Sequence, residues 1–91
     1  MRIASIIMAH KEPQQIERMI RRFDGLPFDF YIHLDKKTEA GPFLYLAGIP
    51  QVKFIRHRTK VKWGSPGFVT ALIRSMQEVL AAEEQYDFIQ V

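Results

Sequence analysis

The sequence predicts an α/β protein in which strands and helices alternate in the order β-α-β-α-β-α-β around a mostly parallel, Rossmann-like sheet. Three observations support this prediction. Short apolar runs recur along the chain, stretches with helical spacing separate them, and proline or glycine marks most boundaries. Alternation of this kind implies right-handed crossovers, which place successive strands parallel to one another.

The first strand is expected at residues 2–9, which are almost all apolar, as in a strand buried on both faces. A helix should begin at Pro13, because proline is favoured in the first helical turn. Gly25 and Pro27 should end this helix. Its apolar residues recur at intervals of three and four and so share one face: Ile16, Met19, Ile20 and Phe23.

The second strand is expected at residues 28–34, which are rich in aromatic residues. A polar loop follows at residues 35–38. A short helix is expected from Pro42 to Gly48, with Pro50 closing it. Residues 52–56 have the composition of a short third strand.

The last third of the chain begins with a basic loop at residues 57–64. Ser65 and Pro66 are typical of a helix start, with serine as the N-cap and proline in the first turn. This helix should run to about Glu83. Its inner face is expected to carry Phe68, Leu72, Met76 and Val79 or Leu80. Residues 86–91 should form a fourth strand.

Composition limits the class of protein. The chain has 91 residues, enough for one small domain or part of one, with 47% hydrophobic and 25% charged residues, as in globular proteins. The absence of cysteine excludes disulfides and cysteine-based metal sites or nucleophiles. The net charge of +3 suits an anionic ligand such as a nucleotide diphosphate but does not argue for nucleic acid. All apolar runs are far shorter than the about 20 residues of a membrane span.

Several motifs are absent from the sequence. There is no GxGxxG, no GxxxxGK[ST] and no nucleophile-elbow serine, so classical dinucleotide, P-loop and serine-hydrolase sites are unsupported. There is also no Asp-x-Asp pair, and His10, His33 and His57 are too scattered to suggest a metal site. We therefore expect neither a metal nor another cofactor.

Candidate binding residues are those that follow the strands, because open parallel sheets bind ligands at the carboxyl ends of their strands. Asp35 comes first: its carboxylate could accept hydrogen bonds from a ribose hydroxyl or a base, or it could be a solvated loop residue. His10 could touch a base or a phosphate, but its position alone favours a structural role, with the side chain bonded to the backbone. His33 alternates with apolar neighbours within a strand and is expected to be structural.

The loop before the last helix offers two further candidates. Trp63 could stack on a base or sugar, or could pack the loop onto the sheet. Basic residues around this loop and after the second strand form a candidate phosphate-binding or anion-binding rim, although surface charges are often only solvated. The rim comprises Lys36, Arg58 and Lys62.

Four segments together resemble a known family. They are Ala4 to Ile20, the run Tyr31-Ile32-His33-Leu34-Asp35-Lys36-Lys37, the turn Val61-Lys62-Trp63-Gly64-Ser65, and the closing residues 86–91. In order and spacing these segments are similar to the N-terminal portion of the core-2/I-branching β-1,6-N-acetylglucosaminyltransferase family, which includes the peptide O-xylosyltransferases. The resemblance covers essentially the whole chain, although no single motif is highly specific.

The resemblance implies the N-terminal, nucleotide-sugar-binding half of a GT-A-type glycosyltransferase. The enzyme would transfer N-acetylglucosamine or a xylose-like sugar from a UDP-sugar to the hydroxyl of a glycan or other acceptor, without a metal. On this resemblance Asp35 would meet the uracil, and Trp63 would lie near the base or ribose. Met8, Ala9 and His10 would line the nucleotide pocket.

The same resemblance places the catalytic carboxylate and the diphosphate-binding residues beyond these 91 residues. The catalytic residues are therefore unassigned, and Glu12 has only its proximity to recommend it as a base. The chain is expected to be a fragment that is inactive alone. Animal members of the family are Golgi membrane proteins, whereas this sequence suggests a bacterial, cytoplasmic relative.

Two other classes of function remain open. The chain could be a stand-alone Rossmann-like module that binds a nucleotide or a protein and catalyses nothing. Nucleic-acid binding through Arg56, Arg58, Lys60 and Lys62 is disfavoured, since only Trp63 supplies the interleaved aromatic residues that such modules use. An incomplete sheet would also expose apolar surface and favour self-association.

Overall fold

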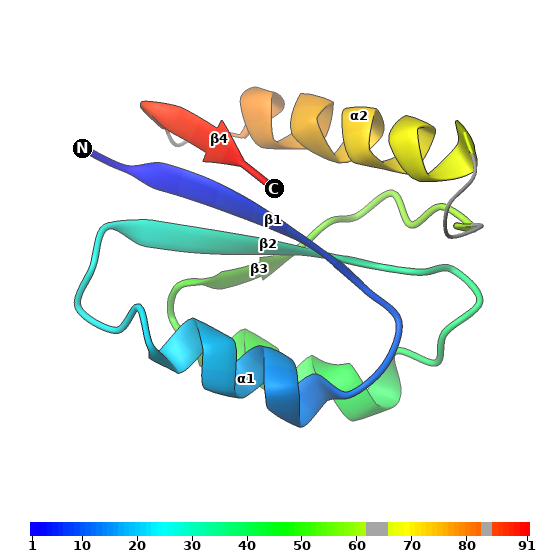
Figure 1. The fold of residues 1–91 in the computed structure, drawn as a ribbon, viewed down its shortest axis with the longest axis horizontal. Coiled ribbons are helices and arrows are strands. Elements are labelled where there is room, and N and C mark those ends of the chain that lie inside the picture. The colour runs from blue at the N-terminus through cyan, green and yellow to red at the C-terminus, as the bar shows by residue number, and fades with distance from the viewer. Residues whose placement is uncertain (62–65, 83–84) are drawn as a thin grey trace.

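The computed structural model describes residues 1–61, 66–82 and 85–91. Its four strands form one parallel sheet in the order β3-β2-β1-β4 (Figure 1). The strands are β1 (Ile3–Ala9), β2 (Phe28–Leu34), β3 (Val52–Phe54) and β4 (Phe88–Gln90). The α/β class and the parallel sheet predicted from the sequence are thus confirmed, and the strand order is consistent with a Rossmann-like fold.

The helices cover both faces of the sheet. Helix α1 (Pro13–Arg21) and the 3₁₀ helix η1 (Gly41–Gly48) lie on one face, and α2 (Pro66–Ala81) lies on the other (Figure 1). This layering explains why β1 and β2 are apolar at nearly every position: both of their faces are buried.

Alternate residues of β2 point to opposite faces of the sheet. Phe30, Ile32 and Leu34 pack in the cluster under α1 and η1, together with Ile20 and Phe43. This cluster is the larger part of the core. It depends on α1, whose Ile20 is fully buried, as the helical spacing predicts.

The other face of the sheet carries a smaller cluster beneath α2. Ala4 and Ile6 of β1, together with Tyr31 of β2, meet Val79 of the helix there. Leu80 was an alternative to Val79 for this inner face, but it is 72% exposed, and Val79 takes the core position. The two residues are adjacent and so lie about 100° apart around the helix, which explains why only one of them reaches the sheet.

The middle crossover differs from the prediction. The helix expected at residues 42–48 is a 3₁₀ helix, so the strict alternation of strands with α-helices is not kept. The reason lies in the spacing of its buried residues, Phe43, Leu46 and Ile49, which recur every third position. A 3₁₀ helix has three residues per turn, so this spacing places all three side chains on one side.

Two strands are shorter than expected. β3 ends at Phe54 rather than at residue 56. The Ile55 N–H still donates to the Ile32 carbonyl at 2.9 Å, but beyond it the backbone N–H groups of Arg56 and His57 donate to the carboxylate of Glu78 on α2. β4 comprises Phe88–Gln90 rather than residues 86–91.

A polar network at the amino end of the sheet holds the segment before β4. The backbone N–H of Arg2 donates to the Asp87 carboxylate at 2.7 Å, and the Asp87 N–H donates to the Arg2 carbonyl at 2.8 Å. The Tyr86 hydroxyl donates to Asp29 Oδ2 at 2.7 Å. Burial, then hydrogen bonds with Tyr31 and Asp29, raise the pKa of Tyr86, so its phenol keeps the proton that it donates.

Two leucines of η1 test the packing of the larger cluster. Leu46 is fully buried and Leu44 is 57% exposed, although they lie two residues apart on the same helix. We expect Leu46→Ala to lower the free energy of unfolding by about 2–5 kcal/mol, because it leaves a cavity in the core. Leu44→Ala should change it by less than about 0.5 kcal/mol. Urea denaturation followed by circular dichroism measures both, and equal effects would contradict the placement of η1.

Candidate functional site

The carboxyl ends of the strands lie along one edge of the sheet. The chain runs from β1 outward to β2 and β3, then crosses to the other side of β1 to form β4. The switch point therefore lies between β1 and β4, and ligands of open α/β sheets bind in the crevice at such a point. The loop after β1 borders this crevice, and the loop after β2 is next to it.

The loop after β1 forms a small hollow of about 210 Å³. Three of the residues proposed to line a nucleotide pocket lie in its wall: Met8, Ala9 and His10. Ala9 is buried, whereas His10 is exposed. The remaining lining residues are Ile7, Lys11, Glu12, Gln15 and Ile16.

Glu12 has an unusual backbone in this hollow. Its φ of 57° and ψ of 63° are left-handed, and among the described residues it alone combines a positive φ with a side chain. This conformation costs a non-glycine residue about 1–2 kcal/mol. Strain of this kind tends to collect at binding and catalytic sites. The strained corner directs the chain from β1 into α1 and so shapes the hollow.

Asp35 lies at the end of β2, beside the hollow, and is only 2% exposed. Its backbone N–H donates to the Ala9 carbonyl at 3.0 Å, which extends the ladder between β1 and β2 by one residue. Its Oδ1 accepts from the N–H groups of Lys37 and Val61 at 3.0 and 3.3 Å. The Lys37 ammonium lies 3.1 Å from Oδ2.

These contacts set the charge of Asp35. Burial raises the pKa of the carboxyl, but the hydrogen bonds from Lys37 and Val61 and the Lys37 charge outweigh it, so the pKa lies below its ordinary value of 3.8. Asp35 is therefore a buried carboxylate that organises its own loop. The sequence placed it correctly but gave no sign of the bond from Val61, which is 26 residues away.

Arg58 faces the same loop and is already engaged. Its Nε donates to the Leu34 carbonyl at 3.0 Å, and its NH2 group donates to the carbonyls of Asp35 and Thr38 at 2.8 and 2.5 Å. Arg58 therefore closes the turn after β2, a role that sequence analysis missed. An anion-binding role for Arg58 remains a prediction.

Of the three remaining rim and stacking residues, the structure describes Lys36. The Lys36 side chain is exposed, and its backbone N–H donates to the Thr59 carbonyl at 3.2 Å. Trp63 and Lys62 lie outside the described residues, so the structure does not test them. Among the described residues, no three His, Asp or Glu side chains are grouped so that they could hold a metal ion.

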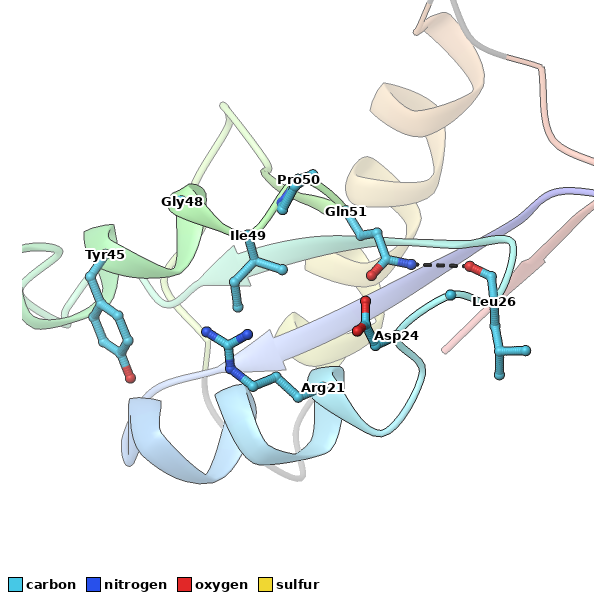
Figure 2. Close-up of a pocket in the computed structure, with 9 residues that line it drawn as sticks. Arg21, Asp24, Leu26, Tyr45, Gly48, Ile49, Pro50 and Gln51 are labelled. Atoms are coloured by element: carbon cyan, nitrogen blue, oxygen red, sulfur yellow. Dashed lines mark hydrogen bonds between the residues drawn. The ribbon is translucent and has the colours of Figure 1, made fainter.

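A larger hollow of about 620 Å³ lies at the opposite, amino end of the strands (Figure 2). Arg21 is the last residue of α1, Asp24 lies in the turn that follows it, and Tyr45 comes from η1. The Gln51 side chain is already bound, since its Nε2 donates to the carbonyls of Leu26 and Phe28 at 3.0 and 2.9 Å. This hollow is separate from the edge that carries His10 and Asp35.

Comparisons with known proteins point to one class of enzyme. No family model matches the chain. A xylosyltransferase, oxt, from Drosophila pseudoobscura pseudoobscura is 24% identical to it over 82 residues. The match covers 84% of this chain but only 9% of that protein. This similarity supports a distant, glycosyltransferase-like relation. None of the helices in the described part of the chain is long and apolar enough to span a bilayer.

The Asp35 contacts predict a pH-dependent contribution to stability. Because the folded pKa is lowered, the contribution is present above about pH 3.8 and is lost as the pH falls through the folded pKa. Asp35→Asn should lower the free energy of unfolding at pH 7 by about 1–3 kcal/mol. It should also flatten the loss of stability in acid.

Asp24→Asn is the matched control, since Asp24 is an exposed aspartate at the far end of the sheet. Urea denaturation between pH 7 and pH 3 measures both variants. If they are equally stable across this range, Asp35 does not stabilise its loop as described.

Proposed function

We propose that this chain supplies the UDP-binding half of a glycosyltransferase, which transfers N-acetylglucosamine or a xylose-like sugar from a UDP-sugar to an acceptor hydroxyl. The observation that carries the proposal is the position of two features at one edge of the parallel sheet. They are the hollow lined by His10 and by Glu12, whose backbone is strained, and the loop built around Asp35. The similarity to a xylosyltransferase agrees with it.

The hollow beside β1 would receive the nucleoside, against Met8, Ala9 and His10. Asp35 would accept a hydrogen bond from the N–H of the uracil ring. Its Oδ2 contacts the Lys37 ammonium, and the Lys37 side chain is 51% exposed. The ammonium also donates to the Val61 carbonyl, so Lys37 would leave both partners for water when the uracil takes its place at Oδ2. A base that lacks an N–H at this position would offer Oδ2 no replacement for Lys37, whereas Oδ1 keeps its two backbone partners.

The leaving diphosphate requires positive charge. We propose that the exposed Lys36, which follows Asp35 in the chain, supplies this charge. Lys62 and Arg58 are proposed as further members of the rim. We propose that transfer is independent of metal. An inverting transfer also requires a general base for the acceptor hydroxyl. We assign that base to no residue of this chain, which covers 9% of the length of the xylosyltransferase that it matches.

Binding of UDP is the first experiment. The ¹⁵N-labelled chain is titrated with UDP, with ADP as the control ligand, and backbone amide shifts are followed by NMR. We expect saturable shifts around His10 and Asp35 that UDP causes and ADP does not.

Two histidine variants locate the site. His10→Ala should weaken UDP binding about tenfold, the loss of roughly one hydrogen bond. His57→Ala is matched to it, because His57 is an exposed histidine that follows β3 at the far edge of the sheet. Equal shifts with both nucleotides, or equal losses in both variants, would contradict a uridine site beside β1.

A protein-interaction module is the second candidate, and an exposed stripe on α2 favours it. Val69, Ile73 and Leu80 are 53%, 49% and 72% exposed. Their spacing of four and seven residues places them along one side of the helix. Apolar side chains grouped in this way are typical of protein contacts. We propose that this stripe supports self-association of the chain.

Sedimentation velocity tests the association. The chain should form a dimer or larger species as its concentration rises, and Leu80→Glu should shift it to the monomer. Leu44→Glu changes an equally apolar residue, 57% exposed, on the opposite side of the sheet and should leave association unchanged. A monomeric chain at high concentration would rule out the stripe as a self-association surface.

A further inference from the structure

The loop between β3 and α2, described over residues 56–61, lies against the end of β2 at the candidate site. Side chains of other elements bind its backbone at several points. At its start, the N–H groups of Arg56 and His57 donate to the two oxygens of Glu78, at 2.7 and 3.2 Å. At its end, the Val61 N–H donates to Asp35. Val61 is fully buried, so this loop is part of the folded core.

The His33 side chain binds the backbone at the centre of this loop. The backbone N–H of Thr59 donates to His33 Nε2 at 3.0 Å. On the other side of the same residue, the Thr59 carbonyl accepts the N–H of Lys36 at 3.2 Å. Thr59 thus joins the loop to β2 and to the turn that carries Asp35.

This contact fixes the protonation state of the imidazole. Nε2 can accept a hydrogen bond only through its lone pair, so the ring must be neutral with its proton on Nδ1. His33 is 1% exposed, so water cannot readily replace a lost partner. A second proton on the ring would turn Nε2 into a donor that faces the Thr59 N–H, another donor.

We propose that His33 is an acid-sensitive latch, which holds Thr59 on the end of β2 while its ring is neutral and releases Thr59 when the ring is protonated. Arg58 and Val61 keep the rest of the loop attached through their own hydrogen bonds. Release would separate Thr59 from β2 and loosen the support of the turn after it. The turn that carries Asp35 would then lose one of its supports in acid, the Thr59 carbonyl that accepts the Lys36 N–H. Nothing in this latch requires a bound nucleotide, so it can be tested whether or not the chain binds UDP.

The pKa of the His33 ring sets the pH at which the latch opens, and both burial and nearby charged groups act on this pKa. Burial lowers the pKa of His33 most strongly. A hydrogen bond with the residue's own backbone and the charges of Asp35 and Glu78 oppose it, and the charge of Arg58 reinforces it. The result is a pKa below the ordinary value of 6.5.

The sign of the effect follows from this shift. Above pH 6.5 the ring is neutral in both folded and unfolded chains. Below it the unfolded chain takes up the proton first, so stability falls as the pH falls. The latch itself opens when the pH passes through the lower pKa of the folded state.

NMR on the unmodified chain tests the latch. Long-range ¹H–¹⁵N spectra of the imidazole report the protonation of His33, and amide exchange reports the protection of Thr59. The Ile7 amide, in the paired region of β1, is the internal reference. As His33 takes up its proton, protection of Thr59 relative to Ile7 should fall about tenfold, the loss of roughly one hydrogen bond.

His33→Gln keeps an acceptor that does not titrate, so protection of Thr59 should no longer depend on pH in this variant. His57→Gln removes an exposed histidine and should leave the wild-type dependence intact. The proposal fails if the His33 ring is protonated while Thr59 stays protected, or if the ring stays neutral until the whole chain unfolds. Both observations come from the unmodified chain, so they decide the matter even if His33→Gln does not fold.

Discussion

The pairing of β1 with β2 is the interaction on which the rest of the structure depends. Seven residues of each strand are in register, from Ile3 opposite Phe28 to Ala9 opposite Leu34. β3 attaches to the outer edge of β2 and β4 to the outer edge of β1. Both hydrophobic clusters include residues of these two central strands. The candidate site is the continuation of the same ladder, because the Asp35 N–H bonds to Ala9 immediately beyond it.

The sequence predicts the parts of this fold that depend on local pattern. Apolar runs located β1 and β2, and the spacing of residues 16–23 located α1. The 3₁₀ form of η1 was missed, although the period of three in Phe43, Leu46 and Ile49 carries the signal. The end of β3 could not be predicted from local pattern, because beyond the last ladder bond, at Ile55, the amides of Arg56 and His57 bind Glu78 of α2, more than 20 residues away in the chain.

The candidate site, too, was predicted from the sequence only where it depends on local pattern. Sequence reasoning identified His10 and Asp35 from their positions after strands, and the structure places both at one edge of the sheet. It gave Arg58 a role toward a ligand, which stays a prediction, and it missed the three backbone carbonyls that the guanidinium binds. A basic residue in a loop looks the same in sequence whether its partner is a phosphate or a carbonyl. Only the path of the surrounding backbone distinguishes the two.

The position of β4 has a consequence for the order of folding. β4 pairs with β1 through Ile3 and Phe88, residues from opposite ends of the chain. Contacts between such distant residues form slowly, because the cost of closing the intervening loop is met before any contact compensates for it. On a ribosome, β1 emerges well before β4, its partner on this side. β1 can pair with β2 early, but its other edge stays open until about residue 88 has been made. Synthesis of this segment therefore includes an interval in which β1, β2 and β3 can already be paired while the other edge of β1 is still unpaired.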